Sequence, residues 1–410
     1  MSLEWESKSF SDLVDIIGGG TPKTSIEEYW DGDIPWISIK DFNSGQKYVL
    51  TTEKTITELG LNNSSTKLLK ENDIIISARG TVGEVAMIKY EMAFNQSCYG
   101  LRVHDLLDKE FVYYLLKYNI YKLKNMVHGA VFDTITTNTF DDIIVNVPPF
   151  KYQEKISYLL SNIDNLIEVK LQENKNLATL AKTIFRDKFI FYKGYESQMI
   201  KTDFGEIPES FEVKSIDEIS KDVVCGKTPS TKVEENYGDK MPFITIPDMH
   251  GNVFVINTER ELSEIGIQSQ IKKTLPKNSI CVSCIATAGL VSLTSKESQT
   301  NQQINSIICK DSISPYFVYL YMEELSEYIK MLGSGGSTTL NLNKREFGKI
   351  ELTIPPKKDM FEFHSMISPL FDKIKSNQYE INNLTKLRDT LLPKLMSGEI
   401  DVSKINCDLK

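Results

Sequence analysis

The residues that could do chemistry in this chain are polar side chains in short glycine-rich stretches, and they form no catalytic set. In the first half these stretches are GGTPKT from Gly19, ARGTVG from Ala78 and the pair Asn95-Gln96. The sequence has no glycine-rich loop before a Lys-Ser/Thr pair, no G-x-S-x-G and no HExxH, which mark phosphate binding, acyl transfer and zinc-dependent hydrolysis. Threonine, lysine, arginine, asparagine and glutamine side chains suit recognition through hydrogen bonds instead.

Two further features resemble enzyme or metal sites. NVPPF at Asn146–Phe150 is similar to the Asn-Pro-Pro-aromatic loop of DNA methyltransferases, but Val147 stands where that loop needs a polar side chain for a flipped base. We expect its prolines to end a strand before a helix. The CxxC of Cys281 and Cys284 has no second pair to complete a zinc site, and the four histidines stand alone. We therefore expect no metal and interpret both cysteines as small apolar strand residues.

The polar stretches recur because the chain is a tandem duplication of one large unit. Pro22 falls on Pro229 at an offset of 207 residues. Further matching pairs are Pro35 with Pro242, Asp41 with Asp248, Asn95-Gln96 with Asn301-Gln302, and Pro148-Pro149 with Pro355-Pro356. A period this long makes each copy the size of a domain, with enough residues to bury its own core.

The elements that must position these side chains are those of mixed α/β domains. Short β-branched runs bounded by glycine, asparagine or proline predict strands; they are Ile34–Ile39, Asp73–Ser77, Asp142–Val147 and Ser279–Ser283. Apolar residues at helical spacing predict helices at Phe111–Lys124 and Pro315–Met331. The polar stretches then lie on loops of rigid domains, where functional side chains are usually found.

A long helical pattern closes each copy. From Lys151 to Phe189 there is no glycine or proline, and apolar residues recur at three- and four-residue spacing; Leu370–Met396 shows the same spacing. Two such apolar stripes can bury each other as an antiparallel pair. About 40 helical residues with a rise of ~1.5 Å each span roughly 60 Å, enough to hold two domains apart.

The predicted fold class is therefore α/β (α+β), with two similar domains separated by an antiparallel pair of long coiled-coil helices and related by an internal pseudo-twofold repeat. We expect the first domain at residues 1–150 and the first long helix at residues 151–194. The second domain then occupies residues 195–356, and the second helix with the C-terminal tail occupies residues 357–410.

Composition limits the classes of function. Of the residues, 41% are hydrophobic and 25% are charged, and no apolar run approaches the ~18 residues of a membrane span. The N-terminus lacks the features of a secretory signal, so we expect a cytoplasmic protein without disulfides. A net charge of −9 is opposite in sign to that of non-specific nucleic-acid binders. DNA contact would require local positive charge, or partner chains that supply phosphate contacts.

Several features together resemble the specificity subunits of Type I restriction-modification systems. They are the duplicated layout, the G-x-TP-x-T opening, ISARGTVG from Ile76, the Asn-Gln pair, the Pro-Pro hinge and the ending LRDTLLPKLMSGEI at Leu387–Ile400. The resemblance covers nearly the whole chain, and the LLPKLMSG ending is distinctive by itself.

This resemblance implies two target-recognition domains, each reading one half of a split, asymmetric site in double-stranded DNA. It implies helices that act as a ruler and dock two modification (methyltransferase) subunits, with two restriction (translocase/nuclease) subunits added. It also implies that S-adenosylmethionine, ATP and Mg belong to those partners. The chain itself is then expected to be non-catalytic, without a cofactor and without a membrane partner.

The expected contacts follow from the resemblance and the polar loops. The DNA-contact candidates in the first copy are Thr21, Lys23, Thr24, Lys40, Asp41, Arg79, Thr81, Asn95 and Gln96. In the second copy they are Thr228, Ser230, Thr231, Lys232, Asp248, His250, Thr287, Asn301, Gln302, Gln303, Ser334 and Ser337. The candidate subunit contacts on the helices are Ile156, Ile163, Leu384, Leu391 and Leu395. Where the copies agree we expect fold or backbone contacts, and where they differ we expect base choice.

Some alternatives stay open on the sequence alone. Asn95 and Gln96 suit a turn as well as a base contact. A fused adenine methyltransferase-recognition chain would need a cofactor-binding motif, which the sequence lacks. A coiled-coil scaffold whose globular ends bind protein is the other alternative. The bases read by each half do not follow from the sequence, because no code links loop residues to base pairs.

Overall fold

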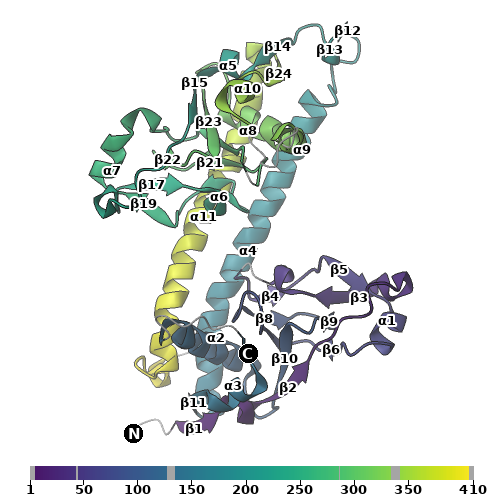
Figure 1. Ribbon diagram of the computed structural model, residues 1–410, viewed down its shortest axis with the longest axis vertical. Coiled ribbons are helices and arrows are strands. Elements are labelled where there is room, and N and C mark those ends of the chain that lie inside the picture. The colour runs from purple at the N-terminus through teal and green to yellow at the C-terminus, as the bar shows by residue number, and fades with distance from the viewer. Residues whose placement is uncertain (1–4, 43–44, 127–133, 286, 334–341, 406–410) are drawn as a thin grey trace. The chain divides into compact units, whose positions relative to one another are not determined.

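The computed structural model describes residues 5–42, 45–126, 134–285, 287–333 and 342–405. The chain divides into two compact units: unit 1 is Met1–Val169 with Asn383–Lys410, and unit 2 is Lys170–Asn382. Two long helices, α4 (Phe150–Phe189) and α11 (Lys357–Met396), each contribute to both units (Figure 1). Within the described ranges, no helix combines the length and apolar character needed to cross a membrane.

Unit 1 is built around a five-stranded and a four-stranded sheet. The five-stranded sheet has the order β2 (Val14–Gly18), β10 (Cys98–Val103), β7 (Ile74–Ser77), β8 (Val85–Ile88), β4 (Tyr48–Val49). The four-stranded sheet has the order β5 (Lys54–Ile56), β3 (Trp30–Ile37), β9 (Met92–Phe94), β6 (Leu68–Leu69). The remaining elements are the pair β1 (Glu6–Ser9) and β11 (Ile144–Val147), with α1 (Glu58–Asn62), α2 (Lys109–Met126) and α3 (Thr137–Asp142).

Unit 2 repeats this plan. Its five-stranded sheet has the order β15 (Ser220–Cys225), β23 (Ile304–Cys309), β20 (Ile280–Ser283), β21 (Val291–Thr294), β18 (Phe254–Val255). Its four-stranded sheet has the order β16 (Tyr237–Gly238), β19 (Arg260–Leu262), β17 (Met241–Ile244), β22 (Gln299–Thr300). Two strand pairs accompany them, β14 (Glu212–Ser215) with β24 (Glu351–Ile354) and β12 (Met199–Thr202) with β13 (Gly205–Pro208). The helices are α5 (Ile216–Ile219), α6 (Ile246–Met249), α7 (Glu264–Ser269), α8 (Pro315–Glu324), α9 (Ser326–Gly333) and α10 (Lys344–Gly348).

The central strands read as continuous apolar runs because both faces of each five-stranded sheet are covered. In β7, Ile74 and Ile76 belong to one core cluster and Ile75 belongs to another, as the two-residue alternation of a strand requires. In β20, Cys281 is fully buried in a second core cluster of unit 2, with Val224 and Ile304. Its prediction as a small apolar strand residue is confirmed, and burial raises the pKa of its thiol to about 12. Cys284 is buried as well but follows the end of β20 at Ser283, so the prediction of a strand residue was wrong there.

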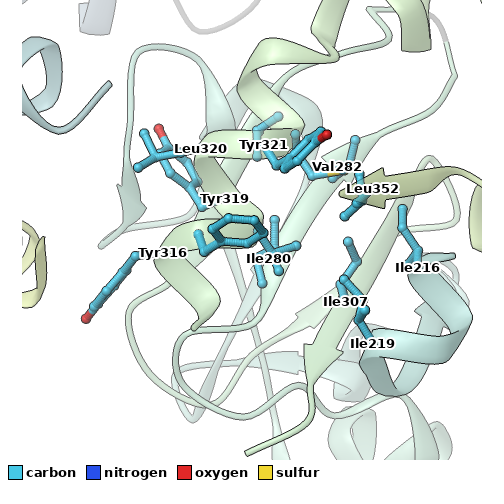
Figure 2. Packing of buried hydrophobic residues seen from close by; sticks show 14 of the residues in the cluster. Ile216, Ile219, Ile280, Val282, Ile307, Tyr316, Tyr319, Leu320, Tyr321 and Leu352 are labelled. Carbon is cyan, nitrogen blue, oxygen red and sulfur yellow. The ribbon is translucent and has the colours of Figure 1, made fainter. Parts of the chain in front are cut away.

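The larger core of unit 2 lies between its five-stranded sheet and helix α8. Figure 2 shows Ile280 and Ile307 of the sheet together with Tyr319 and Leu320 of α8. Leu352 of β24 belongs to the same cluster. The aromatic residues of α8 therefore hold the helix against the sheet. The helix predicted at Pro315–Met331 is in fact two helices, because α8 ends at Glu324 and α9 starts at Ser326.

Helices α4 and α11 run antiparallel within each unit. In unit 1, Asp164 of α4 pairs with Arg388 of α11, while Ile156 shares a core with Leu395. In unit 2, Lys373 Nζ of α11 lies 3.6 Å from Glu173 Oε1 of α4, and the ring centroids of Phe185 and Phe363 lie 6.1 Å apart. In both units the residue number in α11 falls as the number in α4 rises. This confirms the predicted antiparallel pair.

The Pro-Pro sequences end a strand before each long helix, as predicted. β11 ends at Val147 and α4 begins at Phe150, while β24 ends at Ile354 and α11 begins at Lys357. The apolar spacing in the second copy was clear only from Leu370, but the segment expected for the second helix began at residue 357, where α11 begins. Its first turns pack Met360, Phe363 and Ile367 into the core of unit 2.

Candidate nucleic-acid interface

The polar loops of unit 1 come together because of strand pairing in its five-stranded sheet. Gly18, the last residue of β2, pairs with Tyr99, and Ser77, the last residue of β7, pairs with Cys98 at the start of β10. The loops that follow β2 and β7 and the turn that precedes β10 therefore leave the same end of the sheet. We call residues 19–24, 78–83 and 95–97 loop cluster 1.

Unit 2 has the same arrangement. Cys225 at the end of β15 pairs with Asn305, and Ser283 at the end of β20 pairs with Ile304 at the start of β23. We call residues 226–232, 284–289 and 301–303 loop cluster 2; residue 286 lies outside the described residues. The strand pairing thus brings together the candidates from three separate stretches of sequence in each copy.

The Asn-Gln pair forms a tight turn in both units. The Asn95 side-chain Oδ1 accepts a hydrogen bond from the Ser97 backbone N–H at 3.1 Å, and Asn301 accepts one from Gln303 at 3.0 Å. These are Asx turns, in which the asparagine fixes its own loop. Asn301 is buried, whereas Gln302 points to solvent. The asparagines therefore serve the turn, which was one of the two roles open on the sequence.

The exposed glutamines are tied to the opening loop. The Thr228 hydroxyl Oγ1 donates to Gln302 Oε1 at 2.6 Å, and the Thr21 hydroxyl donates to Gln96 Oε1 in unit 1. The first glycine of each loop allows this close approach. A Cβ at Gly226 would lie 2.1 Å from the Asn301 carbonyl oxygen, too near for any other residue.

A serine that the sequence analysis did not select fixes the second loop of each cluster. The Ser77 hydroxyl donates to the Thr81 carbonyl at 2.5 Å, and the Ser283 hydroxyl donates to the Thr287 carbonyl at 2.6 Å. Each serine oxygen also accepts a backbone hydrogen bond at 2.8 Å on the far side of its loop. The matched positions of the two serines in the repeat could have revealed this role.

Most candidates in the loop clusters are accessible. The exposed side chains are Lys23, Thr24, Arg79, Thr81, Gln96, Ser230, Thr231, Lys232, Thr287 and Gln302. Those of intermediate exposure are Thr21, Asn95, Thr228 and Gln303. Outside the clusters, Lys40 and His250 are exposed, and Lys40 lies 3.6 Å from the Glu53 carboxylate. Ser334 and Ser337 lie outside the described residues.

Local charge in the loop clusters is positive although the chain is acidic. The charged residues of cluster 1 are Lys23 and Arg79, and those of cluster 2 are Lys227 and Lys232, with no aspartate or glutamate in either set. All four side chains are exposed. Each cluster, as defined, thus carries two positive charges in a chain whose net charge is −9.

Asp41 and Asp248, which we expected to contact DNA, accept hydrogen bonds within the fold. The Asp248 carboxylate accepts hydrogen bonds from the Thr245 N–H and hydroxyl at 2.8 and 2.7 Å and from the Glu259 N–H at 2.8 Å. Asp41 accepts the equivalent three bonds from Ser38 and Glu53. Both oxygens of each carboxylate are therefore in use, and a carboxylate would also repel phosphate.

The structure corrects two of the predicted subunit contacts. Ile156 and Leu395 are 0% and 1% exposed and belong to the same core cluster of unit 1, so they leave no surface for another chain. Ile163 is 9% exposed. Leu384 and Leu391 are of intermediate exposure. The helical spacing identified the stripe but could not separate the face that pairs with the other helix from the face left outside.

A buried polar network that no sequence motif predicts connects α4 to the rest of unit 1. The Lys47 ammonium lies 2.5 Å from the Glu110 carboxylate and 2.9 Å from the Ser161 hydroxyl. Tyr48 donates to the same carboxylate at 3.0 Å. Burial alone would raise the pKa of Glu110, but Lys47 and these hydrogen bonds lower it below its ordinary value. The network fixes α2, α4 and the strand β4 as one body.

Comparison with known proteins identifies the family that shares this architecture. The protein family described as the Type I restriction modification DNA specificity domain matches the sequence twice, at residues 2–179 and at residues 208–386. The double match coincides with the tandem repeat.

Two relatives match over most of their length. The Type I restriction enzyme HindI specificity subunit of Haemophilus influenzae is 35% identical over 355 residues, which cover 71% of this chain and 77% of that protein. The MjaIX specificity subunit of Methanocaldococcus jannaschii is 30% identical over 419 residues, covering 98% and 95%. The crystal structure of the Type I S subunit from M. genitalium covers 96% of both chains with a TM-score of 0.58 at 18% identity, a likeness that shows the fold.

Proposed function

Because this chain belongs to the specificity subunits of Type I restriction-modification systems, we propose that its two units each read one half of a split, asymmetric sequence in double-stranded DNA. The chain is the non-catalytic, DNA-recognising subunit of such a system. Family membership decides against the fused methyltransferase and the protein-binding scaffold, since members of this family are specificity subunits.

One observation carries the proposal that each unit is a separate reader. Both units place three loops at the same end of a five-stranded sheet, with two exposed positive charges and the same Asx turn in each cluster. The clusters share their framework and differ at exposed positions, as two readers of different sequences require. Arg79 of cluster 1, for example, matches Ile285 of cluster 2.

We assign target recognition to residues 1–150 and 195–356, and spacing of the two readers to residues 151–194 and 357–410. Two observations support this division. Residues 1–150 and 195–356 each contain a polar loop cluster, and residues 151–194 and 357–410 each consist mainly of a long helix.

The partners are DNA and the modification and restriction subunits of the system. We propose two copies of each subunit, with S-adenosylmethionine, ATP and Mg bound to them, and action in the cytoplasm. The outer faces of the helices are the proposed docking surface in place of the buried stripe. In unit 1 the large exposed apolar side chains on these helices are Phe150, Tyr158, Leu166, Val169 and Leu387.

The experiment uses the chain assembled with its modification subunits. Duplexes selected from a random pool by this complex should share a split motif with an unspecified spacer. The chain alone should neither methylate nor cleave DNA, and calorimetry should detect no binding of S-adenosylmethionine to it. Tight binding of that cofactor by the chain alone, or a selected pool without a shared sequence, would contradict the proposal.

A further inference from the structure

The threonine-glutamine pair is the same in both units and is not needed to close the turn beneath it. The Asx turn is already fixed by Asn95 and Asn301 through bonds to the backbone. The glutamines that follow them are exposed, and a threonine from the opening loop holds each one. An exposed side chain held in one orientation is prepared for a partner outside the chain, because less conformational freedom is lost when it binds.

The direction of the hydrogen bond limits what that partner is. Glutamine reads adenine with Oε1 and Nε2 together, both facing the base edge. Here the Thr228 hydroxyl lies against Gln302 Oε1 at 2.6 Å, so that oxygen is turned to the protein. Among the described residues, Nε2 of Gln302 has no partner, and the same holds for Gln96. Each unit therefore presents a donor, which requires an acceptor on the ligand.

The duplication identifies the acceptor. On the proposed function, the two units read different base sequences, so a contact that is identical in both units fits the part of DNA that does not vary. That part is the phosphodiester backbone, whose oxygens accept hydrogen bonds from glutamine as well as from charged side chains. We infer that Gln96 and Gln302, oriented by Thr21 and Thr228, donate from Nε2 to backbone phosphate oxygens of the DNA and do not read a base.

The inference rests on the proposed function, and binding measurements can test the two separately. The complex of the chain with its modification subunits is titrated with a duplex that contains the recognised sequence and with one that lacks it, over a series of salt concentrations. Gln302→Ala should weaken binding to both duplexes by the same factor, about ten-fold for one hydrogen bond from a neutral donor to a charged phosphate. The slope of log affinity against log salt should not change, because a neutral donor displaces no counterion.

Further variants make the result independent of one substitution. Thr228→Val should also lower the affinity for both duplexes. The double variant Thr228→Val with Gln302→Ala should bind DNA as tightly as Gln302→Ala alone, since the threonine acts through the glutamine. Gln302→Lys should strengthen binding to both duplexes. It should also steepen the slope of log affinity against log salt by about 0.9, because the lysine makes a charged phosphate contact that releases counterions. The control is Gln198→Ala, an exposed glutamine of unit 2 before β12, which should bind as the parent does.

The outcomes are distinct. If Gln302→Ala lost affinity only for the duplex with the recognised sequence, or changed the sequence preference, the inference would be overturned, because Gln302 would then read a base. Equal binding by Gln302→Ala and the parent would overturn it because no contact would exist. A parent complex that prefers neither duplex would contradict the proposed function itself.

Discussion

Arg79 is the residue at which the two loop clusters differ most in chemistry. It lies on the loop that the Ser77 hydroxyl holds, directly before Gly80. Gly80 and Gly83 of this loop have positive φ values of 79° and 81°, which favour glycine. At the matching place in unit 2 stands Ile285, which cannot donate a hydrogen bond. Arginine is the commonest reader of guanine through a bidentate contact in the major groove. A residue of this kind in one unit alone is suited to base choice by that unit.

We predict that Arg79→Ala impairs recognition of one half-site and leaves the sequence read by the other half unchanged. Loss of one good base contact costs about 1–3 kcal/mol. The measurement is methylation of duplexes with single changes in either half by the complex with its modification subunits. Unchanged activity on every duplex would remove Arg79 from the interface; Ser230→Ala should instead affect the other half only.

At the same scale, the sequence was a good guide to loop residues but not to their roles. Asp41 and Asn95 were both expected contacts because they lie in polar stretches that match between the two copies. The structure uses both inside the fold, where Asp41 accepts bonds from Ser38 and Glu53, residues near it in the chain. The same residue type can hydrogen-bond to its own loop or to a ligand, and the sequence does not tell which. Only the hydrogen bonds of the folded chain distinguish them.

At the scale of elements, the pair of long helices is held by a buried ion pair as well as by apolar contacts. Arg388 Nη1 of α11 lies 2.8 Å from Asp164 Oδ1 of α4, with exposed side-chain fractions of 10% and 4%. Tyr114 of α2 donates to the other oxygen of Asp164 at 2.6 Å. Burial alone would lower the pKa of Arg388, but Asp164 and Asp389 raise it above its ordinary value. The guanidinium is therefore always charged.

Asp164→Ala should lower the free energy of unfolding by about 3–5 kcal/mol, because it leaves a charge buried without its main partner. Asp164→Leu combined with Arg388→Met should recover most of that loss, since apolar side chains of similar size can replace a buried pair. Urea unfolding of the full chain measures both. If the single and double variants were destabilised equally, the ion pair would not be the source of the effect.

The elements themselves were largely predictable. The strand at Asp73–Ser77 was predictable because a strand buried on both faces is a continuous apolar run. The helices after each Pro-Pro sequence were predictable because a helix buried along one stripe has apolar residues at three- and four-residue spacing. The network of Lys47, Glu110 and Ser161 was not predictable. Its members are far apart in the chain, and their pairing depends on how α2 and α4 pack against the sheet.

At the scale of the whole molecule, the proposed ruler is the pair formed by α4 and α11. Because the two helices pair in both units, a test must lengthen both. One heptad inserted after Val169 and one after Asn382 keeps each apolar stripe in register and adds about 10 Å. With ~3.4 Å per base pair of DNA, the unspecified spacer should grow by up to about three base pairs while the outer half-sites stay the same.

Two-residue insertions at the same places are the matched control. They rotate each stripe by ~200° and should prevent assembly with the modification subunits. An active heptad variant with an unchanged spacer would mean that the helices dock partners without setting the distance between the readers.

The central claim is that this chain alone decides which DNA sequence the complex modifies, one half per unit. Mapping methylated bases across the genome of cells that carry the modification subunits, with and without the chain, tests this. We expect a single split motif with an unspecified spacer, present only with the chain. A continuous motif, or the same methylated sites in cells without the chain, would contradict it.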